Sequence, residues 1–397
     1  MNKPASGDSS FLKNMNKSTL LNMVRAQRAV SRAELAKRTK LTRATVSALV
    51  EELIEEHLVV ETGTGESSGG RKPVMLELNA SAGCVIGIDL RVTNLLMLVT
   101  DMRGVVLKKQ VISYDSDPGG AAGPDRRLNQ IIGVLEEAVI ALPESPLGLI
   151  GVGVGIHGFV EYPSGRIAFM PHTGWKNLQW KSVLEERLGV PVLIDNEANL
   201  AALGEWEYGA GANPGCTNML YLSVAGGIGA GLILNGELFR GGGGFAGEVG
   251  HTTLETNGRP CSCGNKGCWE RYASEQAVAG ELGLSYAPGI TEELLRRMKE
   301  KDAEVLAALQ QAGAYLGIGI GNMMHTLNPQ MIVIGGSMSR YASWLHDSLQ
   351  QSLQARFSYL SSFRVQVDYS QLGEDGCALG AATSLIRERL RLQPANS

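Results

Sequence analysis

The segment from Glu248 to Glu270, EVGHTTLETNGRPCSCGNKGCWE, combines one histidine with three closely spaced cysteines. Two glycines between the second and third cysteines allow the backbone to fold back, so that the thiols can converge. One imidazole and three thiolates form a closed tetrahedral set for Zn²⁺, which is the composition of a structural rather than a catalytic site. The sequence therefore predicts structural zinc, with a disulfide pair and a bystander histidine as the alternative. The predicted ligands are His251, Cys261, Cys263 and Cys268.

The same residues carry a resemblance to a known family. The order GH, then CxCGxxGCxE, resembles the zinc signature of the ROK family of repressors, open reading frames and sugar kinases. The glycine-rich stretch from Leu222 to His251 resembles the family's glycine signature and directly precedes it. The resemblance covers residues 81 to 390 and implies an α/β fold, the two-lobed actin-like ATPase architecture of the ROK sugar kinases. Residues 81–397 then form a sugar-binding domain, with residues 81–198 and the C-terminal helix in one lobe and residues 199–384 in the other.

Length and composition agree with a chain of two or three globular domains. The sequence has 397 residues, of which 44% are hydrophobic and 19% are charged. No apolar run reaches membrane-spanning length, and the first residues, MNKPASGDSS, are polar and unlike a secretory signal. We therefore expect a cytoplasmic protein with reduced thiols and no membrane partner.

The charge is divided unevenly along the chain. The formal net charge is −4, but residues 1–80 hold 12 Lys and Arg against 9 Asp and Glu, so this segment carries +3 and the remainder −7. A basic segment joined to an acidic body indicates two separate roles, of which the first is contact with nucleic acid.

The basic segment has the spacing of a helix-turn-helix. Apolar residues between Asn16 and Gln27 predict a first helix, the capping box from Ser31 to Glu34 begins a second, and Thr42 caps a third. In this motif the N-terminal end of the third helix enters the major groove. The residues expected to contact DNA there are Arg43, Ala44, Thr45 and Ser47. A generic helical bundle with solvated polar residues is the alternative.

Two alternating runs follow the third helix and predict a β-hairpin wing. They are LVVETG and RKPVMLEL, separated by a Gly/Ser-rich tip. Arg71 and Lys72 lie where the hairpin returns, a place from which basic residues neutralise phosphates or enter a narrow minor groove. The stretch GGRKP resembles the wing of ROK-family repressors. Residues 1–80 are thus predicted to be a winged helix-turn-helix domain that binds a two-fold symmetric operator as a homodimer or a dimer of dimers.

The phosphate loops depart from the pattern of the ROK kinases. The first phosphate loop of the ROK kinases resembles DxGGTK. At the corresponding place this chain has Asp89 to Asn94, with Arg91 and Val92 at the two glycine positions. In the second loop Gly226 takes the place of the threonine that would bind a phosphate oxygen. Side chains occupy space that phosphate needs, so the sequence predicts a protein that is not an enzyme.

The sugar-binding positions of the family are better kept. Asn196 and Glu197 match the first two positions of an N-D-A-N pattern, in which the Asp is the general base of the kinases. Glu197 stands at the position of that Asp, and its longer side chain places the carboxylate one methylene further from the backbone. The resemblance implies that the sugar is held by Asn196, Glu197, Glu248, His251 and Glu270. His251 therefore has two possible roles, as sugar neighbour and as metal ligand. His157, Asn177 and Trp180 are further candidates near the sugar, with open roles.

The run IDNEAN followed by LGE resembles the ROK repressors of bacterial xylose operons. A pentopyranose has no hydroxymethyl group, and the longer Glu197 can fill the space left by that carbon. The predicted function is therefore repression released by xylose as inducer. The alternatives are a repressor responding to glucose, N-acetylglucosamine or another hexose, an active ROK sugar kinase, and a repressor controlled by a phosphotransferase protein.

Overall fold

The computed structural model describes residues 9–64, 72–114, 123–213, 215–359 and 365–390. Its N-terminal unit contains three helices and a small antiparallel sheet with strand order β1-β3-β2. The first helix begins at Ser9, seven residues before the predicted start, and the two predicted capping residues are confirmed. Ser31 accepts a hydrogen bond from the Glu34 backbone N–H, and Thr42 accepts one from that of Thr45. The elements are α1 (Ser9–Ala26), α2 (Arg32–Thr39), α3 (Arg43–Glu55), β1 (Val30–Ser31), β2 (Val59–Thr64) and β3 (Val74–Leu78).

The first large sheet has the strand order β11-β7-β4-β5-β6. Strands β4, β7 and β11 run parallel, and β5 and β6 are antiparallel additions at one side. Apolar residues of α4 and α5 cover one face of this sheet. The elements are β4 (Cys84–Leu90), β5 (Asn94–Thr100), β6 (Val106–Ser113), α4 (Gly123–Ile140), β7 (Leu149–Ile156), α5 (Trp180–Leu188) and β11 (Val192–Asn196). A small sheet follows β7, made of β8 (Phe159–Glu161), β9 (Arg166–Met170) and β10 (Trp175–Leu178).

The second large sheet has the strand order β14-β13-β12-β15-β16. Its core on one face is filled by the helices that follow the cysteine segment, above all α10 and α11, which also pack on each other. The strands are β12 (Met219–Val224), β13 (Ile228–Leu234), β14 (Glu237–Phe239), β15 (Met331–Gly335) and β16 (Gln366–Tyr369). The helices are α7 (Glu270–Ala273), α8 (Glu275–Glu281), α9 (Ile290–Lys299), α10 (Ala303–Leu327) and α11 (Ala342–Arg356).

Two helices, α6 (Glu197–Tyr208) and α12 (Gly376–Leu390), lie between the two large sheets. They touch backbone to backbone, because a β-carbon added at Gly380 would lie only 1.7 Å from the Leu200 carbonyl oxygen. A β-carbon at Gly204 would likewise lie 2.4 Å from the carbonyl oxygen of Gly376. Side chains at these glycines would separate the helices, so α6 and α12 are held as one closely packed pair.

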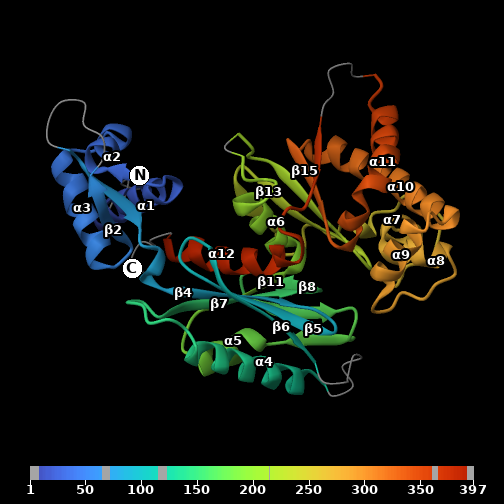
Figure 1. Ribbon diagram of the computed structural model, residues 1–397, viewed down its shortest axis with the longest axis horizontal. Coiled ribbons are helices and arrows are strands. Elements are labelled where there is room, and N and C mark those ends of the chain that lie inside the picture. The colour runs from blue at the N-terminus through green and yellow to red at the C-terminus, as the bar shows by residue number, and fades with distance from the viewer. Residues whose placement is uncertain (1–8, 65–71, 115–122, 214, 360–364, 391–397) are drawn as a thin grey trace, which may run out of the picture.

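Helix α12 also reaches the N-terminal unit. Its residues Leu385, Ile386 and Leu390 are buried in the same apolar cluster as Leu20 and Leu21 of α1. In Figure 1 the red helix α12 extends from the centre of the molecule to the blue N-terminal helices. Among the described residues, no helix is both long and apolar enough to cross a membrane.

Candidate functional site

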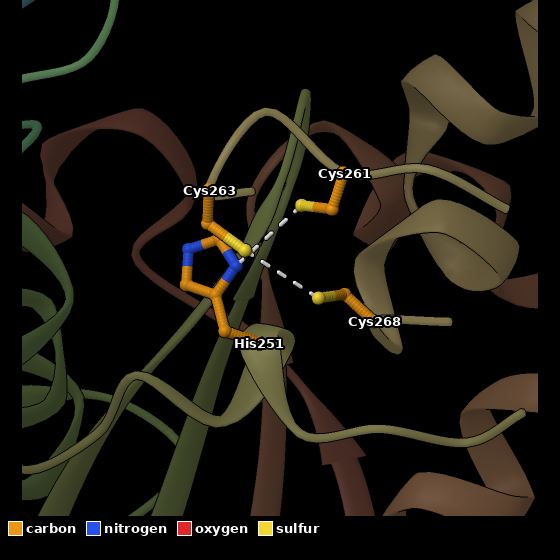
Figure 2. Close-up of side chains that lie close together, drawn as sticks. All are labelled: His251, Cys261, Cys263 and Cys268. Atoms are coloured by element: carbon orange, nitrogen blue, oxygen red, sulfur yellow. Dashed lines mark hydrogen bonds between the residues drawn. The ribbon is translucent and has the colours of Figure 1, made fainter. Parts of the chain in front are cut away.

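The four predicted metal ligands converge on one point (Figure 2). Their ligand atoms all lie within 4.8 Å of one another. The Nδ1 atom of His251 is 3.8 Å from the Cys261 sulfur, and the sulfurs of Cys263 and Cys268 are 3.6 Å apart. Tetrahedral zinc with Zn–S bonds of about 2.3 Å separates its sulfurs by roughly 3.8 Å. The spacing fits a metal ion, and none of the six described cysteines forms a disulfide in the structure.

The backbone around the cysteines brings these ligands together. Gly264 and Gly267 both have positive φ, +94° and +75°, which a residue with a side chain rarely adopts. Gly267 also approaches the Glu255 carbonyl so closely that an added β-carbon would lie 1.8 Å from that oxygen. An isolated bridge between Thr253 and Cys268 then places the last thiol beside the histidine segment. The predicted role of the two glycines is therefore confirmed.

Two of the predicted sugar residues lie beside this cluster. Glu270 begins α7, two residues after the last cysteine, and its Oε1 accepts a hydrogen bond from the Cys261 thiol at 3.1 Å. Glu248 immediately precedes the short 3-10 helix that carries His251. Burial, with the negative charge of Glu270 nearby, raises the pKa of Glu248 to about 7. Both carboxylates therefore lie on chain segments that also carry ligands of the cluster.

A second group of charged side chains gathers at the ends of β4, β7 and β11. His157 follows β7, and its Nε2 is 2.9 Å from Oδ1 of the buried Asp89 at the end of β4. Arg91 donates to the other oxygen of Asp89 at 2.7 Å. Burial of Asp89 would raise the pKa of its carboxyl, but the charges of His157 and Arg91 outweigh it and lower that pKa. Asp89 is therefore an ionised carboxylate held between two cations.

Glu197 completes this second group from the start of α6. Its Oε1 accepts a hydrogen bond from the Ser223 hydroxyl at 2.7 Å, and its Oε2 is 3.9 Å from Nδ1 of His157. Burial of Glu197 raises the pKa of its carboxyl. The two groups of side chains are linked electrostatically through His172, because burial and the charge of His157 lower the pKa of His172 whereas Glu270 raises it. Nothing in the sequence pattern pointed to Ser223 or His172.

The side chain of Asn196 forms hydrogen bonds with the backbone of its own protein chain. It is the N-cap of α6, where its Oδ1 accepts hydrogen bonds from the backbone N–H groups of Ala198 and Asn199. Its side-chain amide donates to the Gly158 carbonyl at 3.0 Å, which ties the loop after β7 to α6. Of the open candidates, Trp180 is buried in the core beneath the first sheet, and Asn177 accepts a hydrogen bond from Arg166.

The turn that resembles the first phosphate loop is filled by an ion-pair network. Besides holding Asp89, the Arg91 guanidinium donates to the Glu374 side chain at 3.0 Å and to the Glu374 carbonyl at 2.9 Å. Glu374 lies two residues before the first residue of α12, so the loop between β4 and β5 is joined to the segment that leads into that helix. The space that a glycine pair would leave open for phosphate is occupied by this side chain.

The second phosphate loop is also closely covered. A β-carbon added at Gly226 would lie 2.8 Å from the ring of Tyr286. A threonine at this position, as in the kinases that the loop resembles, requires Tyr286 to move. Tyr286 lies near the buried carboxylate of Glu275, which accepts hydrogen bonds from the hydroxyls of Ser337 and Tyr341, at 2.7 and 2.5 Å. The contact between Gly226 and Tyr286 was not apparent from the sequence, because 60 residues separate these two positions.

The residues predicted to contact DNA lie at the start of α3. Arg43 and Ala44 are exposed, and Thr45 and Ser47 are half-buried. The Thr45 hydroxyl lies 2.8 Å from that of the capping Thr42. Lys72 is exposed just before β3, whereas Arg71 and the rest of the predicted wing tip lie outside the described residues. Strands β2 and β3 pair antiparallel, as the wing prediction requires.

Known proteins with similar sequence and structure include both repressors and kinases. A xylose repressor of Bacillus spizizenii is 37% identical over 383 residues, which cover 96% of this chain and 98% of that protein. A glucokinase of Halalkalibacterium halodurans is 31% identical over 331 residues, which cover 78% of this chain and 97% of the kinase. A ROK family transcriptional regulator, described as a homologue of the E. coli MLC protein, has a crystal structure that matches with a TM-score of 0.80 at 26% identity, covering 96% of this chain and 97% of that one.

The family assignment follows from these matches and from the geometry. The described architecture is the actin-like, sugar-kinase-like fold predicted from the sequence, and residues 85–388 match the ROK family. The xylose repressor aligns with the N-terminal unit as well as with the body. This chain therefore belongs to the ROK family.

Proposed function

We propose that this protein is a transcriptional repressor of xylose-utilisation genes, which binds operator DNA through its N-terminal unit and releases it when xylose binds to the body. Relatives named xylose repressors align over 96% of the chain. The glucokinase relative covers only 78% of the chain. The observation that carries the proposal is a basic helix-turn-helix unit joined to a sugar-kinase fold whose phosphate loops are filled by side chains.

The sugar is held, in this proposal, by the carboxylates that the two charged groups present. Glu197, Glu248 and Glu270 supply hydrogen-bond acceptors. The charges of His157 and Glu270 both shift the pKa of His172, and His157 lies beside Glu197. Neutral sugars are recognised by such arrays of fixed polar groups. His251, whose Nδ1 faces the Cys261 sulfur, serves here as a metal ligand and positions Glu248 three residues before it.

We infer further that the His251, Cys261, Cys263 and Cys268 cluster holds structural Zn²⁺. Three thiolates and one imidazole match the preference of zinc, and all four ligands come from the chain, which leaves no open position for catalysis. When bound, the ion would supply folding energy to a segment whose residues are mostly exposed or half-buried. The residues themselves then fix the place of Glu270 at the start of α7.

The packing of α6 and α12 supports a route from sugar to operator. Helix α6 begins with Glu197 and, near its other end, Glu207 forms an ion pair with Arg25 of α1. Helix α12 begins beside Glu374 and ends in the apolar core of the N-terminal unit. A sugar that binds one conformation better than another shifts the population toward it. Any movement of the α6–α12 pair on sugar binding is transmitted directly to α1.

Catalysis is expected to be absent. With ATP, Mg²⁺ and xylose or glucose, the purified protein should show no sugar-dependent ADP release above background, because Arg91 and Tyr286 occupy the phosphate loops. A coupled assay run beside the Halalkalibacterium halodurans glucokinase provides the positive control. Turnover on the order of 1 per second or faster would show an active kinase instead.

Base reading is expected to depend on Arg43. If the Arg43 guanidinium binds a base edge, Arg43→Ala should reduce the difference in binding free energy between specific and nonspecific DNA by about 1–3 kcal/mol. Lys72→Ala should weaken binding to all duplexes alike and reduce the salt dependence. Fluorescence anisotropy at several salt concentrations separates the two effects, and Arg296→Ala on α9 is the control. An unchanged ratio in Arg43→Ala would place base reading elsewhere on α3.

A further inference from the structure

His157 occupies an unusual place between two carboxylates. Its Nε2 is 2.9 Å from Asp89, whereas its Nδ1 is 3.9 Å from Oε2 of Glu197, beyond hydrogen-bond distance. The imidazole side chain is 33% exposed, and that of Glu197 is 17% exposed. The two facing atoms, a ring nitrogen and a carboxylate oxygen, are therefore close to each other, incompletely satisfied and accessible.

Because the His157 imidazole is protonated, its Nδ1–H is a hydrogen-bond donor that lies beside an acceptor, Oε2 of Glu197. Burial of His157 opposes its protonation, but the carboxylates of Glu197 and Asp89 outweigh burial and raise the pKa of the imidazole to about 9. At neutral pH both ring nitrogens therefore carry protons. One N–H is used by Asp89, and the other points toward the acceptor on Glu197.

Both members of the pair are held in place by neighbours. The Ser223 hydroxyl fixes the other oxygen of Glu197, and Arg91 fixes the other oxygen of Asp89. The Asn196 amide holds the Gly158 carbonyl, next to His157 in the chain. Groups fixed in this way bind a ligand without first losing their own conformational freedom.

We propose that Nδ1 of His157 and Oε2 of Glu197 together bind one hydroxyl group of the sugar, so that His157 is a specificity-determining residue of the site. A hydroxyl donates one hydrogen bond and accepts others, and it can lie about 2.8 Å from both atoms. This inference rests on the proposed function and deepens it. A sugar that lacks this hydroxyl covers the imidazole N–H and the carboxylate oxygen without pairing either of them, which costs binding free energy.

The test is a set of calorimetric titrations with xylose and with the analogues that each lack one of its hydroxyls. Wild-type protein should lose about 10- to 100-fold in affinity for the analogue whose missing hydroxyl is read by this pair. In His157→Phe and His157→Gln the affinity ratio of xylose to that analogue should fall toward one, while the ratios for the other analogues stay as in the wild type. Two variants are used because the larger change could prevent folding, which thermal melting reveals.

His346→Gln is the matched control, since it removes a hydrogen-bonded histidine on α11, away from these residues, and should leave every ratio unchanged. If the His157 variants weaken all sugars equally and leave every ratio as in the wild type, His157 only holds the fold, and the inference is wrong. If the wild type itself binds no xylose, the proposed inducer is wrong as well. The wild-type titration thus separates the two failures.

Discussion

Glu197→Ala is expected to give a repressor that binds its operator normally and no longer releases it when xylose is added. Glu197 lies at the first residue of α6, far along that helix from the Arg25 contact of Glu207, so its loss leaves the DNA-binding unit intact. Removing a buried acceptor for a sugar hydroxyl should weaken xylose binding by about 1.5–3 kcal/mol, roughly 10- to 150-fold. Glu248→Ala should have the same effect from the other charged group.

Gel-shift titrations with and without xylose measure this directly. Glu136→Ala is the matched control, because Glu136 is a carboxylate on α4 that pairs with Arg187 at the surface. It should release the operator at the wild-type xylose concentration. If Glu197→Ala or Glu248→Ala also releases the operator at that xylose concentration, these carboxylates do not form the inducer site. The hexose and protein-partner alternatives then gain support.

Cys263→Ser is expected to lose the bound metal and the response to xylose together. Removing one ligand from a closed four-ligand site releases the folding energy that the metal supplies, and Glu270 begins its helix only two residues after the last cysteine. Metal analysis should find about one zinc per wild-type chain and well under one in the variant. Xylose titration should show a loss of at least about tenfold in inducer affinity.

Cys216→Ser provides the comparison, since Cys216 is a buried thiol outside the cluster. It should keep both zinc and the response to xylose. Wild-type protein purified without chelators that contains no zinc, together with a Cys263→Ser variant that responds normally, would contradict a structural metal at this place.

Local chemistry made much of the fold predictable from the sequence. The caps at Ser31 and Thr42 and the convergence of the cysteines depend on residues close together in the chain. The residue types indicate the backbone conformation at these places, as glycine does at Gly267, where φ is positive. These are the features that periodicity and spacing report.

The contacts that define the site depend on residues distant in the chain. Arg91 pairs with Glu374, 283 positions away, and this ion pair gives a physical reason for a closed phosphate loop that the sequence showed only as missing glycines. The pair of His157 and Glu197 likewise joins the ends of β7 and β11, and periodicity does not report which side chains meet there. Asn196 was predicted from its motif to bind the sugar, and in the structure its side chain caps the N-terminus of α6.

Release of operator DNA by xylose alone is the most direct test of the proposed function. Wild-type protein bound to a duplex that it has selected from random sequences is titrated with xylose, glucose and N-acetylglucosamine, and fluorescence anisotropy follows the DNA. Xylose should release the duplex with no other protein present, and the two hexose sugars should leave it bound at the same concentrations. DNA that stays bound at saturating xylose, or that is released more readily by either hexose sugar, would contradict the proposal.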